Sequence, residues 1–164
     1  MDRYLLCDID EDSLKELHAV VFDKSRSDIY LDITSGGGDS YTMLGFHDLI
    51  KTSPRRIIGT AYGSCQSAAV LVLAACHVRR ASRNTIFMVH EDTYQTDDLH
   101  HDVKKAVQQH EVEENLWATL MAESTRLGYT SWRALSKEVT YFGPEMAKSH
   151  GLIDKILTYE KAKK

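Results

Sequence analysis

The sequence predicts an α/β domain, in which short apolar strands alternate with helices along the chain. Two observations carry this prediction. Compact runs rich in β-branched and apolar residues recur at 29–33, 57–61 and 85–89, which is typical of strands. Between these runs, apolar residues recur at the spacing of a helix face. The 164 residues contain only two prolines and no linker, so we expect a single domain over 1–164.

The first elements are a strand at 4–7, an amphipathic helix and a second strand at 29–33. Ser13 or Asp12 is expected to cap this first helix, because short polar side chains satisfy the free N–H groups of a helix start. Its apolar side is formed by Leu14, Leu17, Val20 and Val21. A second helix is expected over 40–50.

The middle of the chain combines two strands with two very different helices. The strand at 57–61 leads through a turn of small residues at 63–69 into a helix with the apolar run 70–75, and the strand at 85–89 follows. A long helical pattern then covers 97–126. Such a helix exceeds what one small domain buries, so part of its apolar stripe is expected to meet another subunit. We expect Gly128 to close it at the C′ position.

The C-terminal part is predicted to be built from short elements. A helix at 131–137 has Trp132 and Leu135 on its buried side. An extended segment at 139–142 comes next, and Gly-Pro-Glu at 143–145 opens a further helix. A last strand is expected over 151–157.

Composition and charge exclude several classes of function. The net charge is −4, without the basic stripe that a nucleic-acid-binding protein needs. The three cysteines, Cys7, Cys65 and Cys76, lack paired C-x-x-C spacing, which argues against a disulfide framework and a zinc site. No apolar run has the length that spans a bilayer, and the N-terminus lacks the pattern of a signal peptide. We therefore expect a cytoplasmic protein that binds no nucleic acid, membrane or cofactor.

The turn at 63–69, Gly-Ser-Cys-Gln-Ser-Ala-Ala, is the main candidate for a catalytic site. It joins a strand to an apolar helix, so a serine in it lies near the helix N-terminus. Unpaired N–H groups and the helix dipole favour a developing oxyanion there, which is a geometry suited to acyl transfer. Ordinary capping and packing is the alternative interpretation of such small residues.

Two further segments add groups that acyl transfer uses. The glycines at 36–38 follow a strand, and they let N–H groups approach a ligand closely; a flexible turn is the alternative. His90 ends a strand and is placed to act as a general base, whereas a surface histidine is the alternative. His100 and His101 are adjacent on a predicted helix and point in different directions, so we expect no metal site there.

Four blocks follow one another along the chain. They are Ile-Tyr-Leu-Asp-Ile-Thr-Ser-Gly-Gly-Gly at 29–38, the turn at 63–69, Met-Val-His-Glu at 88–91 and Ala-Lys-Ser-His-Gly-Leu-Ile-Asp at 147–154. In this order and spacing they resemble the Clp protease proteolytic subunit (ClpP) family of serine peptidases, over about 4–157. The resemblance implies a crotonase-like ββα superhelix. Its head would comprise about 1–96 and 128–157, and its long protruding handle helix about 97–126.

The resemblance also implies a role for individual residues. Ser67 falls on the nucleophile of the family and His90 on the general base. Gly38 and Ala68 fall on the residues whose backbone N–H groups form the oxyanion hole. The residues themselves had already indicated the turn at 63–69, the glycines and His90.

The third member of the catalytic triad departs from the family pattern. Alignment back from Gly151 without gaps places Val139 where the family has an aspartate. A valine cannot hold an imidazole tautomer or stabilise an imidazolium, and losing that role in serine proteases costs on the order of 10⁴ in turnover. Glu138 is the nearest carboxylate and a candidate substitute.

The function implied is that of an ATP-dependent-type serine endopeptidase subunit, which hydrolyses unfolded polypeptides or short peptides inside an oligomeric chamber. Its subunits would form homo-oligomeric heptamer rings, stacked as a tetradecamer. The resemblance further implies a AAA+ unfoldase as a partner. The first strand is expected to begin at Tyr4, which argues against the docking of such an unfoldase.

Two other functions compete with this one. A catalytically weak or inactive ring subunit is favoured by Val139. An enzyme acting on acyl-CoA thioesters would share the fold and the oxyanion hole. Such an enzyme has no need for the pair of Ser67 and His90.

Overall fold

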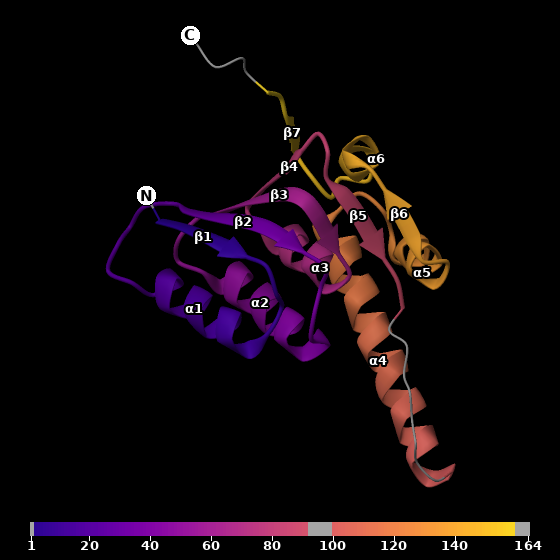
Figure 1. The fold of residues 1–164 in the computed structure, drawn as a ribbon. Coiled ribbons are helices and arrows are strands. Elements are labelled where there is room, and N and C mark those ends of the chain that lie inside the picture. The colour runs from indigo at the N-terminus through magenta and orange to yellow at the C-terminus, as the bar shows by residue number, and fades with distance from the viewer. Residues whose placement is uncertain (1, 92–99, 160–164) are drawn as a thin grey trace.

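The computed structural model describes residues 2–91 and 100–159 (Figure 1). In this part of the chain seven strands form one sheet: β1 (Asp2–Leu6), β2 (Ile29–Ser35), β3 (Ile57–Gln66), β4 (Val78–Ser82), β5 (Ile86–Val89), β6 (Thr140–Phe142) and β7 (Lys155–Leu157). The helices are α1 (Glu11–Val21), α2 (Ser40–Thr52), α3 (Ala68–Ala75), α4 (His100–Ser124), α5 (Tyr129–Lys137) and α6 (Pro144–Ser149). The predicted α/β class is confirmed.

The sheet is parallel except at one pair of strands. Its main path runs β1-β2-β3-β4-β7, and every neighbouring pair on this path is parallel. Parallel neighbours need crossover connections, and α1, α2 and α3 provide those between β1 and β4 in turn. Figure 1 shows α1 and α2 side by side on the same face of the sheet.

Strand β3 changes its partner along its length, and this positions the site. Residues 58–61 of β3 pair with β4, whereas residues 64–66 pair with β5. The change falls around Gly63, whose φ of 62° lies in the left-handed region that glycine adopts without strain. Because β3 and β5 are parallel, their carboxyl ends meet at the same edge of the sheet. The residues that follow these two strands are therefore brought together.

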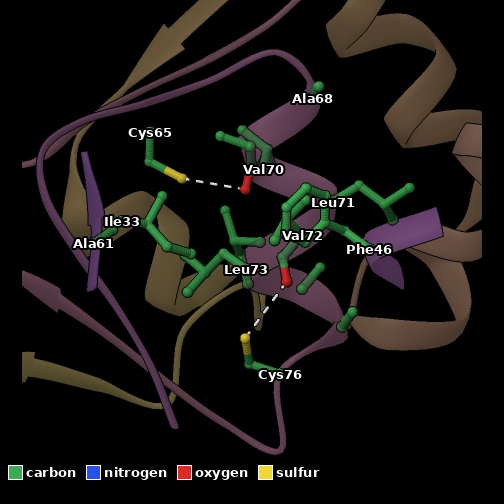
Figure 2. Close-up of a cluster of buried hydrophobic side chains, with 14 of the residues drawn as sticks. Ile33, Phe46, Ala61, Cys65, Ala68, Val70, Leu71, Val72, Leu73 and Cys76 are labelled. Atoms are coloured by element: carbon green, nitrogen blue, oxygen red, sulfur yellow. Dashed lines mark hydrogen bonds between the residues drawn. The ribbon is translucent and has the colours of Figure 1, made fainter. Parts of the chain in front are cut away.

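Helix α3 forms the centre of the core. All eight of its residues are buried, as expected for a helix that is apolar on every side. Figure 2 shows it among Ile33, Phe46 and Ala61, and the thiols of Cys65 and Cys76 donate hydrogen bonds to its carbonyl groups. The turn that precedes α3 therefore rests on a closely packed support.

Helix α4 has 25 residues, which corresponds to a length of about 37 Å. Its C-terminal half packs on the core through the buried residues Ala118 and Met121, whereas Val107 and Val112 are 60% and 61% exposed. Its N-terminal end lies far from the sheet (Figure 1). Residues 97–99 of the predicted helix, and the side chains of His100 and His101, lie outside the described part. No helix within the described residues is long and apolar enough to cross a membrane.

The cap of α1 differs from the prediction. Asp10, rather than Ser13 or Asp12, is the N-cap, and its carboxylate accepts the Ser13 N–H at 2.8 Å. The hydroxyl of Ser13 in turn accepts the Asp10 N–H at 3.3 Å. Asp10 has extended φ and ψ angles whereas Ser13 is already helical, so only Asp10 has the backbone geometry of a cap.

The end of α4, the presence of β4 and the bounds of β7 also differ from the predictions. Gly128 does not close α4, which ends at Ser124; with φ −75° and ψ 167° it is the N-cap of α5. Strand β4 was not predicted, because the two arginines in Val-Arg-Arg-Ala-Ser hide its β-character. The last strand covers only Lys155–Leu157 of the expected segment 151–157.

Candidate active site

Ser67 lies in the sharp turn between β3 and α3. Its φ of 52° and ψ of −125° are unusual for a residue other than glycine. Its N–H donates to the carbonyl of Met88 at 2.8 Å, which ties the turn to β5. Such strained turns cluster at functional sites, where the surrounding structure enforces them.

The Ser67 hydroxyl does not cap the helix that it precedes. Serine at an N-cap usually accepts a hydrogen bond from the first turn, but Ser67 makes no such bond. Its Oγ instead lies 2.9 Å from Nε2 of His90, which follows β5. The N-terminal N–H groups of α3, beginning at Ala68, are thus left without a side-chain cap from Ser67.

The second ring nitrogen of His90 also has a partner. Nδ1 lies 2.8 Å from the main-chain carbonyl oxygen of Glu91. A carbonyl oxygen only accepts hydrogen bonds, so Nδ1 must carry the proton. In the neutral ring Nε2 is then the acceptor for the Ser67 hydroxyl. The site therefore holds the histidine in the tautomer that a general base requires.

The glycine loop after β2 packs against the serine. A Cβ atom added to Gly37 would lie 2.7 Å from Cβ of Ser67, and one added to Gly38 would overlap the carbonyl of Ile9. Both glycines have positive φ, at 113° and 154°. The N–H of Ile9 donates to the carbonyl of Gly37, and the N–H of Asp39 donates to the carbonyl of Ile9. These two hydrogen bonds lie on either side of Gly38. The N–H of Gly38 takes no part in this pairing.

A small pocket opens beside Ser67 and His90. Ser67, Ala68 and His90 line it, together with apolar side chains from α2, β5 and α4 and two carboxylates from α4. These further residues are Met43, Val89, Trp117, Glu113 and Glu114. The pocket thus offers an apolar wall next to the serine, with acidic groups contributed by the long helix.

The two other candidate nucleophiles of the segment 63–69, Ser64 and Cys65, lie in β3 rather than in the predicted turn, and they point elsewhere. Cys65 is fully buried, and this burial raises the pKa of its thiol well above the usual range. Figure 2 shows Cys65 directed into the core. The hydroxyl of Ser64 donates to the carbonyl of Ser35 at 3.2 Å. Of the three side chains, only that of Ser67 contacts a histidine.

Neither candidate for the triad acid forms a hydrogen bond or ion pair with His90. Glu138 follows α5 with its side chain exposed, and its carboxylate makes no hydrogen bond or ion pair with the described residues. Val139 is 52% exposed and has a φ of 50°. No carboxylate among the described residues forms a hydrogen bond or ion pair with the imidazole of His90.

A cluster of charges next to His90 was not predicted from the sequence. The guanidinium of Arg133, on α5, lies 3.2 Å from Oε1 of Glu91 and 2.7 Å from Oε2 of Glu114 on α4. The sequence could have indicated Glu91, because this residue ends the Met-Val-His-Glu block. Its partners come from distant helices, so only the fold reveals them. No group of three or more metal-binding side chains occurs in the described residues.

Comparison with known proteins supports a family assignment. The family model described as Clp protease matches residues 6–160, nearly the whole chain. No curated protein matches the chain. The family match supports a peptidase, in agreement with the resemblance of the four sequence blocks.

Proposed function

This chain belongs to the Clp protease family, and from that premise we propose that it is a serine endopeptidase subunit that hydrolyses unfolded polypeptides or short peptides. One observation carries the proposal. The hydroxyl of Ser67 lies 2.9 Å from Nε2 of His90, and the Nδ1–H of the same ring donates to the carbonyl of Glu91. This pairing of nucleophile and correctly protonated base is what acyl transfer by serine requires.

The proposed reaction follows from these positions. Nε2 of His90 takes the proton of the Ser67 hydroxyl as Oγ attacks the carbonyl carbon of the peptide. The N–H groups of Gly38 and Ala68 stabilise the oxyanion of the tetrahedral intermediate. The imidazolium then gives its proton to the leaving amine as the C–N bond breaks. A water molecule, deprotonated by His90, hydrolyses the acyl-enzyme and restores Ser67.

An active-site-directed fluorophosphonate tests the nucleophile. We expect one covalent adduct on the intact protein, mapped by mass spectrometry to Ser67 and absent in Ser67→Ala. His90→Ala should abolish hydrolysis of a fluorogenic peptide. No adduct with the wild type, or an adduct that survives in Ser67→Ala, would refute the assignment.

We further propose that the fold is a crotonase-like ββα superhelix in which α4 is the handle of a homo-oligomeric ring. Val112 and Leu116, four residues apart on this helix, form an apolar row that is 61% and 40% exposed. This row supports the proposal, because exposed apolar side chains favour contact with another subunit. Heptamer rings, stacked as a tetradecamer, are the assembly that the family resemblance implies. Sedimentation of the purified chain measures it.

A catalytically weak or inactive ring subunit is the second candidate function. Val139 at the position of the family aspartate favours it, because no carboxylate then stabilises the imidazolium. Turnover of a fluorogenic peptide by the purified chain separates the two functions. Hydrolysis that depends on His90 would exclude the inactive subunit.

A further inference from the structure

We propose that the main-chain carbonyl of Glu91 orients His90 in place of a triad carboxylate, and that Arg133 is a positioning residue that holds this carbonyl. The proposal rests on the proposed function, since it assigns the groups that prepare His90 for catalysis. It is carried by the 2.8 Å contact between Nδ1 of His90 and the Glu91 oxygen.

In a serine protease triad the aspartate performs two tasks. It fixes the imidazole in one tautomer and orientation, and its charge stabilises the imidazolium that forms during the reaction. A carbonyl oxygen performs the first task, because it accepts only from a protonated Nδ1. It performs the second only through its dipole, since hydrogen bonds to a neutral acceptor are roughly half as strong as those to a charged one. Glu91 therefore supplies the geometry of a triad without its full electrostatic stabilisation.

A carbonyl can orient a ring only if the residue that carries it is held in place, and Glu91 is held on two sides. Its N–H donates to the carbonyl of Ser136 on α5 at 3.0 Å. Its carboxylate lies 3.2 Å from the guanidinium of Arg133, one turn earlier on the same helix. Both contacts attach residue 91 to α5 just after β5 ends.

Arg133 is itself anchored on the other side. Its Nη1 donates to Oε2 of Glu114 at 2.7 Å, and the Glu114 side chain is only 9% exposed. A buried carboxylate needs a charged partner, so this pair fixes the guanidinium strongly. Arg133 consequently joins α4, α5 and the end of β5 around the histidine.

Two substitutions of Glu91 separate positioning from a charge effect. Glu91→Gln removes the charge but keeps an acceptor for Arg133, whereas Glu91→Ala removes both and leaves the main-chain carbonyl. We expect Glu91→Ala to lower kcat roughly 10- to 100-fold with little change in KM, since small misplacements of a catalytic group cost about 100-fold. Glu91→Gln should retain most of the wild-type kcat.

The contribution of Arg133 is tested without leaving a buried charge behind. Arg133→Met combined with Glu114→Gln removes the guanidinium of Arg133 together with the carboxylate charge of Glu114. We expect this double variant to lower kcat as Glu91→Ala does. Arg79→Met is the matched control. Arg79 is also a half-buried arginine, and its Nη2 lies 2.9 Å from Oδ1 of Asp154. This pair is remote from the site, so the loss of Arg79 should leave kcat unchanged.

The tautomer of His90 supplies a readout that does not depend on activity. Solid-state ¹⁵N spectra of histidine-labelled protein, with His90→Gln to assign the signal, report which ring nitrogen carries the proton. We expect a protonated Nδ1 in the wild type and in Glu91→Gln, and a mixture of tautomers in Glu91→Ala. A wild-type tautomer and kcat in Glu91→Ala would overturn the proposal, and so would equal losses in the Gln and Ala variants. A wild type that labels at no serine overturns the proposed function instead, while the tautomer still decides this inference.

Discussion

His90 and Val139 flank the last residue pair of the β5–β6 ladder, Val89 and Thr140. The antiparallel register joins Met88 to Tyr141 and Val89 to Thr140, and it ends there. His90 follows Val89, whereas Val139, whose φ of 50° is not that of a strand, precedes Thr140. We expect an aspartate at position 139 to bring a carboxylate close to the imidazole of His90. Valine offers no acceptor, and the partner of Nδ1 is the main-chain oxygen of Glu91.

Val139→Asp should raise the peptidase activity. The new carboxylate would add a charged acceptor beside the imidazolium, and charged hydrogen bonds are roughly twice as strong as neutral ones. We expect kcat to rise about tenfold, equivalent to about 1.4 kcal/mol of transition-state stabilisation. The gain stays well below the roughly 10⁴ associated with a wrong tautomer, because Glu91 already sets the tautomer. Steady-state hydrolysis of a fluorogenic peptide measures it.

Val139→Asn is the matched control for this change. Val139 has a φ of 50°, a conformation that costs a β-branched residue more than it costs Asn or Asp. Both variants should therefore be more stable than the wild type, by about 1 kcal/mol, in denaturant unfolding. Only the Asp variant should be faster. Equal kcat values for Asp and Asn would show that the charge at position 139 does not reach His90.

Gly38→Ala and Gly36→Ala should have opposite outcomes. A Cβ on Gly38 would overlap the carbonyl of Ile9, and its φ of 154° disfavours other residues. A Cβ on Gly36 meets nothing within 4 Å. If the Gly38 N–H stabilises the oxyanion, distorting it should lower kcat by about 10²- to 10³-fold, whereas Gly36→Ala should behave like the wild type. Peptide hydrolysis and fluorophosphonate labelling rates check both, and a Gly38→Ala enzyme with normal rates would remove Gly38 from the oxyanion hole.

Local patterns in the sequence predicted the parts of the site that follow strands. His90 comes directly after the β-rich run at 85–89, and the glycines at 36–38 and Ser67 follow the runs at 29–33 and 57–61 after a few more residues. The β3–β5 pairing brings Ser67 and His90 together. Periodicity also revealed most of the helices, because their apolar faces pack on one core.

The other features of the fold and the site have no recognisable pattern in a single sequence. The acceptor for Nδ1 of His90 is a main-chain atom, which every residue possesses. Arg133 and Glu114 meet only because α4 and α5 pack together. In β4, the charged pair of arginines concealed a central strand. Tertiary packing decided each of these features, and local propensity did not encode them.

His150→Phe should stabilise the protein and reduce its sensitivity to acid. The Nδ1 atom of His150 is buried without a hydrogen-bond partner among the described residues, and its ring lies near Trp132 and Phe142, with centroids 6.0 and 5.8 Å away. Phenylalanine keeps these contacts and removes the unsatisfied atom. We expect a gain of about 1 kcal/mol at neutral pH, measured by urea unfolding.

The pH dependence follows from the titration of the same ring. Burial lowers the pKa of His150 below its usual value of 6.5. As the pH falls through 6.5, the unfolded chain binds a proton that the folded chain does not, so the wild type loses stability until the folded pKa is passed. The stability advantage of His150→Phe should therefore grow between pH 7 and pH 5. Parallel stability curves for the two proteins over this range would contradict the role of His150.

The exposed apolar side of α4 yields a prediction about assembly. Val112 is 61% exposed, and Glu111, the adjacent residue, is also exposed but charged. Adjacent helical residues point in different directions, so Val112→Lys disrupts the apolar row whereas Glu111→Lys introduces the same side chain beside it. If α4 contacts another subunit through this row, a buried lysine ammonium would cost several kcal/mol per contact. Sedimentation velocity should then show smaller species for Val112→Lys, and the wild-type distribution for Glu111→Lys. Identical distributions for all three proteins would place the subunit contact elsewhere.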